Sequence, residues 1–531
     1  MRLALMVIVA LLLVAALALW QLAAGDRPAG PVIASGLPRS LDPVAASRLD
    51  EIRLVGALFE ALVRIDPSTL KMQPALASSW QISPDRLTWT FYLRANACWS
   101  DGTPLVSADM RRGLVRHLSE GSPYASLLAS LVAGGEVGGD GSAAAITCPD
   151  DHTLVVRVRG PAPDPLAILS LPLFVPATQA QVTSGRGEGW SDPVHMVGNG
   201  PLVCVDHRPR HHYDFAPNPF YRGFHPARGS LRVLVVEDSG CAQRLYLDGQ
   251  IDAIPVLQSD AIRDLGRAQV PGLLRGPSFT VEFLRVRLMP RSPKDSTAIT
   301  QALRHPRLRL ALARAIDRAT LAREVMDGLG EPATIFTPAS LATFLPYHPS
   351  TSRLAYDVHQ ARVDLAAAQA DLGPIPDFEL LVSSTPLERL RGMEFIVDCW
   401  RRTLGLSVHL VVKPTIEVRA QEERGDFDLS RGVWLGDYVD PTTFLDVWRA
   451  DSRLNRGGFA DQEYDALLNA ASRTTGEERW RLLEKAEERL TEQVPFIPLV
   501  NTTCNMLVRP GLIGLAPNPM EYVWLDEVGW R

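Results

Sequence analysis

Short apolar runs rich in β-branched and aromatic residues alternate along the chain with longer amphipathic stretches. The runs predict β-strands, as in LTWTFYL at Leu87–Leu93, because such side chains suit a pleated, half-buried surface. Further strands are predicted at Thr153–Val158, Pro201–Asp206, Leu231–Glu237, Thr280–Leu288, Phe378–Val382, Ser407–Val412 and Phe427–Val433, with more after Phe496.

The amphipathic stretches predict helices, of which His305–Met326 is the clearest because its apolar residues recur at helical spacing. A second helix is expected over Ser107–His117, with Ser107 as its N-cap. Others are predicted at Leu54–Val63, Leu387–Leu404, Glu463–Ala471 and Gly476–Val494. Strands and helices that alternate throughout the chain predict an α/β fold with partly parallel sheets.

The N-terminal end of the chain is an export segment. Leu3–Trp20 is an unbroken apolar run of eighteen residues that follows Arg2. It reads either as a signal peptide with a cleavage site near Ala23-Ala24-Gly25, or as a membrane anchor at the lower limit of spanning length. On both interpretations the chain beyond Asp26 lies outside the cytoplasm, and residues 25–40, rich in Gly and Pro, form a linker.

Composition excludes several classes of protein. The 531 residues are 46% hydrophobic, enough for a sizeable core in two to four domains of ~100–200 residues each. The net charge of −6 removes the electrostatic basis for nucleic-acid binding. None of the six cysteines forms a CxxC pair, and the sequence does not fix any disulfide pairing.

Motifs that carry catalysis are missing from the sequence. It contains no GxxxxGK[ST], HExxH, EF-hand loop or GxSxG, so we expect a binding protein rather than an enzyme, with no cofactor. His207, His211 and His212 suggest a metal site or an exposed basic loop. We favour the loop because adjacent residues of an extended chain point in opposite directions, and no carboxylate or cysteine stands at ligand spacing; no metal site is predicted.

The segment WLGDYVDP at Trp434–Pro441 follows the predicted strand Phe427–Val433. Ligands of open α/β sheets bind beyond the carboxyl ends of strands. Asp437 beside Trp434 and Tyr438 would hold a cation through charge pairing and aromatic faces. In the alternative interpretation Asp437 caps a turn and the two aromatic side chains belong to the core.

Taken in order, several segments resemble the periplasmic solute-binding components of ABC importers, in the oligopeptide, dipeptide and nickel-binding group (extracellular solute-binding protein family 5). The resemblance extends from Leu41 to Arg531 and rests on Leu41-Asp42-Pro43, Pro74–Trp80 with Leu87–Arg94 and Trp99–Pro104, Val197–Pro201, Asn218–Tyr221, Arg309–Arg318 and Trp434–Pro441 with Phe444-Leu445. The sequence departs from the family pattern at Asn199, Leu202 and Val286-Arg287, and it lacks the cysteine to which many members attach a lipid.

The resemblance implies a two-lobed periplasmic-binding-protein-like fold with a hinge and an extra subdomain in the first lobe. The expected divisions are 1–25 for the signal peptide or anchor, 26–72 and 186–275 for lobe I, 73–185 for the extra subdomain, 276–495 for lobe II and 496–531 for the C-terminal return to lobe I.

It also implies a function: binding di- or oligopeptides between the lobes and delivering them to membrane permease subunits. Asp437 would pair with the peptide's α-amino group, with Trp434, Tyr438 and Asp440 as further ligand contacts. The protein is expected in the periplasm as a monomer, free or tethered to the inner membrane by residues 3–20. The alternatives are a membrane-tethered ligand sensor of the same fold, and binding of a nickel complex or another non-peptide solute.

Overall fold

The computed structural model describes residues 30–118, 121–138, 145–161, 165–183, 190, 192–257, 262, 265, 270–290, 297–350, 353–384 and 388–531. The predicted export segment at residues 1–25 lies outside this part of the chain. None of the helices that the structure describes combines the length and the apolar character needed to cross a membrane.

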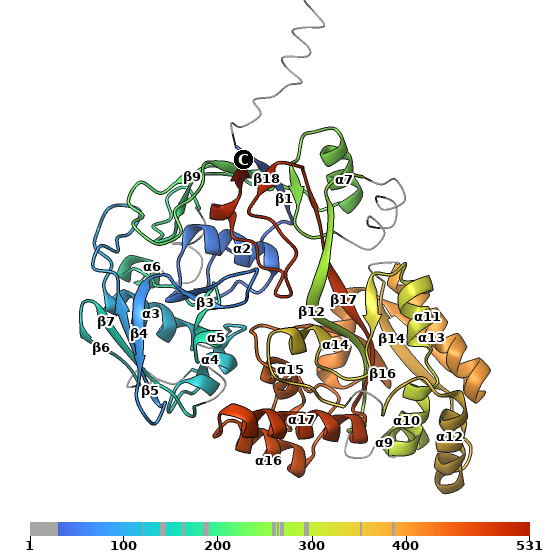
Figure 1. Cartoon of the computed structure of the whole chain (residues 1–531). Coiled ribbons are helices and arrows are strands. Elements are labelled where there is room, and N and C mark those ends of the chain that lie inside the picture. The colour runs from blue at the N-terminus through green and yellow to red at the C-terminus, as the bar shows by residue number, and fades with distance from the viewer. Residues whose placement is uncertain are drawn as a thin grey trace, which may run out of the picture.

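Two long strands connect the two lobes (Figure 1). β12 (Leu273–Val286) and β17 (Phe496–Val508) run antiparallel and pair from Leu273 opposite Leu507 to Arg285 opposite Phe496. The register shifts between Pro277 and Val281, where the strands pass from one lobe to the other, so the ladder is interrupted at the crossing. Such an irregularity lets a strand pair bend, which suits a hinge.

The first lobe continues the sheet on the β17 side. Its strands follow in the order β11 (Ala253–Ile254), β1 (Val32–Ser35), β10 (Leu231–Val235), β9 (His212–Pro217) and β8 (Leu202–Arg208). β1 is parallel to both β10 and β11, and two helices lie beside these strands, α2 (Leu49–Leu58) and α7 (Ser239–Leu247). The carboxyl ends of three strands therefore open towards one edge, which is where α/β sheets bind ligands.

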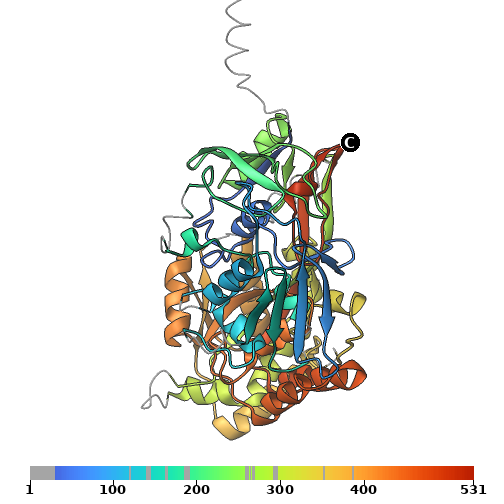
Figure 2. The same ribbon diagram turned by 90° about the vertical axis from the view of Figure 1, so that its left-hand side faces the viewer.

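The extra subdomain carries a separate antiparallel sheet with the strand order β4 (Ala77–Ile82), β5 (Thr88–Leu93), β7 (Thr153–Arg157) and β6 (Ile146–Asp150), seen at the front of Figure 2. α3 (Ser107–His117), α4 (Ala125–Leu131), α5 (Pro165–Leu169) and α6 (Gln179–Thr183) accompany it. Trp89 and Phe91 alternate inwards from β5 and share one hydrophobic core with Leu202 of the first lobe, so the subdomain packs firmly on that lobe.

The second lobe continues the same sheet on the β12 side, in the order β16 (Leu429–Leu435), β14 (Phe378–Ser383) and β15 (Val408–Lys413), while β13 (Gly330–Pro332) pairs with β17. The helices are α9 (Ala298–Arg304), α10 (Pro306–Arg314), α11 (Arg318–Thr320), α12 (Val358–Leu372), α13 (Glu388–Leu404), α14 (Thr415–Arg424), α15 (Thr442–Leu445), α16 (Gln462–Ala471) and α17 (Gly476–Gln493).

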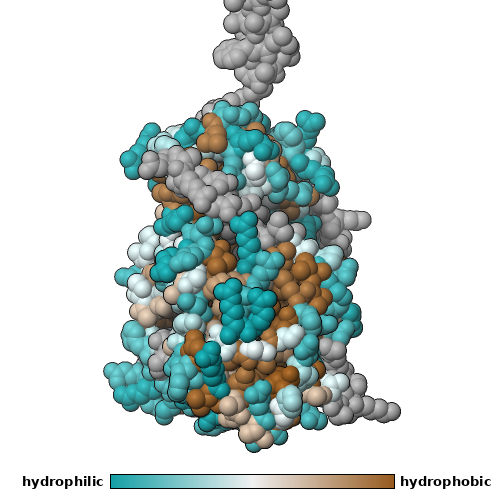
Figure 3. All heavy atoms as spheres, turned by 90° about the vertical axis from the view of Figure 1, so that its right-hand side faces the viewer, coloured by the Kyte–Doolittle hydropathy of each residue, from teal (hydrophilic) through white to brown (hydrophobic). Residues whose placement is uncertain are grey.

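α13 shows how the surface of this lobe is built. Trp400 and Ile396 are buried, while Asp398 turns outwards and forms ion pairs with Arg401 and Arg402. The helix is thus amphipathic as predicted. The space-filling view in Figure 3 shows mostly hydrophilic side chains on this side of the molecule, with hydrophobic ones gathered in its lower half.

Most predicted elements are present, but the helix predicted over His305–Met326 is wrong as a single helix. α10 ends at Arg314, α11 begins at Arg318, and a π-helical turn follows at Leu321–Val325. Asp317 accepts a hydrogen bond from the Thr320 backbone and caps the second helix. The buried Arg318 guanidinium donates to the carbonyls of Ala313 and Pro498, which ends α10 and ties this corner to β17.

Two smaller predictions also change. The helix predicted at Leu54–Val63 is α2, which begins five residues earlier, at Leu49, and ends at Leu58. Ser107 is the first residue of α3 rather than its cap: the cap position is Val106, whose backbone amide donates to the Asp109 carboxylate. The acid of the first turn therefore satisfies the amide of the cap residue, which is the second half of a capping box.

Candidate functional site

Asp437 lies in a tight turn between β16 and α15. Its backbone amide donates to the Thr443 hydroxyl at 2.8 Å, and the Trp434 indole donates to the Thr443 carbonyl at 2.8 Å. A Cβ at Gly436 would lie 2.8 Å from the Phe444 ring, so only glycine fits there. The turn is therefore fixed on both sides, and the direction of the Asp437 side chain is fixed with it.

The Asp437 carboxylate has no cationic partner: no Arg, Lys or His among the described residues lies within ion-pairing distance of it. It is half-buried, and it accepts a hydrogen bond from the Tyr124 hydroxyl. Loss of hydration in this enclosed position raises the pKa of Asp437 from its ordinary 3.8 to about 7, against the lowering effect of the Tyr124 hydrogen bond. The group is thus an acid poised between its two charge states near neutral pH.

Two tyrosines from the first lobe contact Asp437. Tyr124 immediately precedes α4 of the extra subdomain, and Tyr522 belongs to the C-terminal segment. The Tyr522 hydroxyl donates to the Asp437 carbonyl at 3.4 Å. Burial, with a contribution from the Asp437 charge, raises the pKa of both tyrosines well above the ordinary 10. Both phenols therefore stay neutral hydrogen-bond donors, and Asp437 lies where the two lobes meet.

The sequence did not reveal either tyrosine, because neither lies near the Trp434–Pro441 segment in the chain. The only hint in the sequence was the family resemblance. It implied that Asp437 lies between the lobes and therefore has neighbours from the first lobe. Which residues supply those partners depends on how the lobes dock.

Of the two predicted aromatic neighbours, Trp434 is half-buried and packs against the second lobe's core, while Tyr438 is 4% exposed and packs with the core of the first lobe. The Tyr438 hydroxyl lies 3.1 Å from the Thr442 hydroxyl. Tyr438 is therefore an interlobe core residue, as the alternative interpretation of the segment had it, whereas Trp434 keeps part of its surface open.

Asp440 forms an internal ion pair. It lies 2.7 Å from the Arg479 guanidinium and accepts hydrogen bonds from the amide and hydroxyl of Thr442. Both side chains of the ion pair are only 6% exposed. Asp440 therefore ties α15 to α17, and we leave it out of the proposed ligand contacts.

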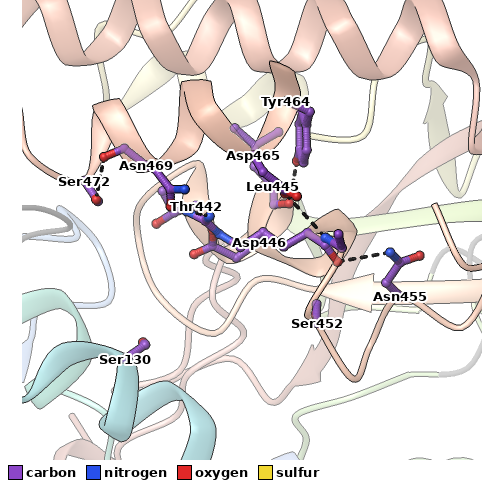
Figure 4. A network of polar contacts seen from close by, with 12 residues as sticks. Ser130, Thr442, Leu445, Asp446, Ser452, Asn455, Tyr464, Asp465, Asn469 and Ser472 are labelled. Carbon is purple, nitrogen blue, oxygen red and sulfur yellow. Dashed lines mark hydrogen bonds and ion pairs between the residues drawn. The ribbon is translucent and has the colours of Figure 1, made fainter. Parts of the chain in front are cut away.

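A second polar network lies further along the interlobe boundary (Figure 4). Asp446 pairs with Arg449 at 2.5 Å, and the Tyr464 hydroxyl donates to the Leu445 carbonyl at 2.5 Å. Figure 4 places Ser130 of α4 on the opposite side of this boundary. Asp446 is thus already paired with Arg449, whereas Asp437 has no cationic partner among the described residues.

The histidine cluster is closer to a metal site than its spacing predicted. The β8–β9 hairpin brings ligand atoms of Asp206, His212 and Asp214 within 4.8 Å of one another, so the expectation that no carboxylate stands at ligand spacing was wrong. However, Arg232 already holds Asp214 through two contacts of 2.6 Å, and His212 lies 2.8 Å from Asp206. A guanidinium at this place supplies the positive charge that a cation would bring.

The sequence profile of the "Bacterial extracellular solute-binding proteins, family 5 Middle" matches residues 71–455. The chain belongs to the family-5 solute-binding proteins. The family is one of extracellular solute-binding proteins, and the two-lobed fold agrees with this assignment.

Curated relatives match this family-5 protein over nearly its whole length. The "Periplasmic murein peptide-binding protein MppA" of Escherichia coli is 28% identical over 521 residues, covering 94% of each chain. The "Probable deoxycholate-binding periplasmic protein YgiS" of the same organism is 29% identical over 509 residues, covering 92% of this chain and 91% of the other. The solved structure of the Escherichia coli murein tripeptide binding protein superposes with a TM-score of 0.79 at 26% identity, covering 94% and 98% of the two chains.

Proposed function

We propose that this protein binds short peptides between its lobes and holds their free α-amino group at Asp437. The observation that carries the proposal is the unpaired, half-buried Asp437 carboxylate at the interlobe boundary. A carboxylate in such a place is costly unless a cation joins it, and an α-ammonium group is a cation of suitable size. The names of peptide-binding relatives such as the murein peptide-binding protein support the choice of peptide.

The surroundings of Asp437 favour an ammonium group over a metal ion. The neighbouring groups are the neutral phenols of Tyr124 and Tyr522, which are fit to accept hydrogen bonds from an NH₃⁺ group through their oxygen atoms. A nickel complex would need ligands that this turn does not offer among the described residues. Trp434, half-exposed beside the acid, would cover the ligand's first residue.

In the cell, we propose, the protein is a periplasmic monomer that delivers its ligand to the permease subunits of an ABC importer. Closure around the ligand would present a joint surface of both lobes to the permease, whereas the open form would not. Membrane fractionation of the native host distinguishes a free periplasmic protein from a tethered one. Deletion of the permease genes should abolish peptide uptake; uptake that persists would favour the ligand-sensor alternative.

The test of the proposed site compares trialanine with N-acetyl-trialanine by titration calorimetry. We expect the unmodified protein to bind trialanine at least a hundredfold more tightly, because acetylation removes the charge that Asp437 neutralises; breaking a buried charge pair costs ~3–5 kcal/mol. Asp437→Asn should lose that preference, while the control Asp440→Asn should keep it. Equal affinities of the unmodified protein for the two peptides would contradict the assignment of Asp437.

A further inference from the structure

Arg53 is a second unpaired charge near the interlobe boundary. It lies on α2 of the first lobe and is only 8% exposed, yet its buried Nε and Nη2 atoms have no hydrogen-bond partner among the described residues. No described carboxylate lies within ion-pairing distance of it. Burial accordingly lowers the pKa of Arg53, although a guanidinium stays protonated in proteins. A buried cation of this kind is costly unless an anion joins it.

Arg53 lines two spaces, although its Nε and Nη2 atoms are themselves buried. On one side it lines a cleft of about 730 Å³ together with Leu49 and Asp50 of α2 and the carboxyl ends of β1, β10 and β11. On the other side it lines a small cavity together with Glu521 and Tyr522. The cleft lies at the strand edge where α/β sheets bind ligands. The cavity links Arg53 to Tyr522, whose hydroxyl contacts the Asp437 turn.

The nearby acids Glu521 and Asp50 attract the Arg53 charge without forming an ion pair with it, because each is engaged elsewhere. Asp50 pairs with Arg48 at 2.7 Å. Glu521 accepts a hydrogen bond from the Ser278 hydroxyl of β12 at 2.7 Å, and its backbone adopts a left-handed conformation with φ of 55°. Such a conformation is strained for a residue with a side chain. Glu521 is thus held towards the hinge strand, and burial raises its pKa, which favours the neutral acid.

We propose that Arg53 binds the carboxylate of the ligand whose ammonium group pairs with Asp437. This inference rests on the proposed function and narrows it: the ligand carries both charges and is short, since it extends past Tyr522 from one charged residue to the other. A guanidinium offers two parallel N–H donors to a carboxylate, and Nε and Nη2 are such a pair on one edge of Arg53. Both atoms are buried in the ligand-free structure, so the proposal requires the side chain to turn towards the cleft when the carboxylate binds. The two ends of the site then have opposite charges, which fixes the direction of the bound peptide.

The test uses dialanine to pentaalanine, each as the free acid and as the C-terminal amide, against the unmodified protein, Arg53→Met and Arg53→Lys. For the length that binds best, we expect the free acid to bind at least tenfold more tightly than the amide. Arg53→Met should remove this difference by weakening the acid alone, and Arg53→Lys should restore part of it. Arg481→Gln, which alters an exposed arginine of α17 away from this cleft, is the control and should leave the difference unchanged.

The possible results distinguish a failure of the Arg53 assignment from a failure of the proposed peptide binding. If the acid and the amide bind equally, or if Arg53→Met weakens both equally, the assignment of Arg53 is overturned while the Asp437 site stands. If no alanine peptide binds in either form, the proposed function fails, and deoxycholate, which has a carboxylate but no amino group, then becomes the ligand to titrate. A melting temperature of ligand-free Arg53→Met several degrees below that of the unmodified protein would show a structural role and would also overturn the assignment.

Discussion

The hydroxyl group of Tyr124 donates a hydrogen bond to the carboxylate of Asp437 across the boundary between the lobes. One partner stands before α4 of the extra subdomain and the other follows β16 of the second lobe. The acid is therefore held by a neutral donor from the opposite lobe, which stabilises its ionised form without neutralising it. Both lobes therefore shape the surroundings of this charge.

The pH dependence of ligand binding follows from the pKa of Asp437, which burial raises to about 7. Only the ionised acid pairs with an ammonium group, so affinity should fall about tenfold for each pH unit below 6.5. It should also fall above pH 8, where the peptide's α-amino group loses its proton. Calorimetry with trialanine between pH 5 and 9 measures the profile; an affinity that stays constant from pH 5 to 7 would contradict it.

The same raised pKa makes a prediction for stability. The folded state binds the Asp437 proton more tightly than the unfolded chain, so its ionisation costs stability as pH rises from about 4 to 7, and the whole cost is present above 7. Moving a carboxyl pKa from 3.8 to about 7 corresponds to about 4 kcal/mol, and opening of the lobes relieves part of it.

We therefore expect Asp437→Asn to raise the free energy of unfolding of the ligand-free protein by about 1–2 kcal/mol at pH 8, and by much less at pH 4. Denaturant unfolding at the two pH values measures the difference. A loss of stability at pH 8 would mean that Asp437 has a structural partner.

Tyr124→Phe removes the donor that helps Asp437 to ionise while leaving the ring in place. One such hydrogen bond is worth ~0.5–1.5 kcal/mol, so affinity for trialanine at pH 7 should fall about three- to tenfold. The pH below which binding weakens should also move upwards. Tyr92→Phe serves as the control, because its hydroxyl contacts only the exposed Gln81 on the same subdomain. An effect of equal size in both variants would count against the interlobe hydrogen bond.

Asp440→Asn tests whether Asp440 stabilises the fold rather than contacting the ligand. It leaves the Arg479 guanidinium buried without its counter-charge, so we expect a loss of about 3 kcal/mol in the free energy of unfolding. Arg481→Gln on the outer face of α17 breaks only exposed ion pairs and should cost less than 1 kcal/mol. If Asp440→Asn unfolded at the same denaturant concentration as Arg481→Gln, the ion pair would not be structural.

Local pattern predicted much of the fold. The strand at Leu87–Leu93 and the helix at Ser107–His117 are where their side chains favour them, because propensity and burial pattern act over a few residues. The helix over His305–Met326 failed because Arg318 hydrogen-bonds to Pro498, a residue far away in the chain. The hydrophobic pattern of the segment carries no information about a contact with a residue so distant in the chain.

By itself the sequence determined the α/β elements, the family resemblance and the turn that carries Asp437, all of which depend on neighbouring residues or on their order. Only the tertiary structure decided which charges of the site are free. Asp440 is paired by Arg479, whereas Asp437 meets the neutral Tyr124, and none of the described carboxylates forms an ion pair with Arg53. The physical reason is that the partner of a buried charge depends on how distant segments pack together. The residues next to that charge in the sequence do not reveal this packing.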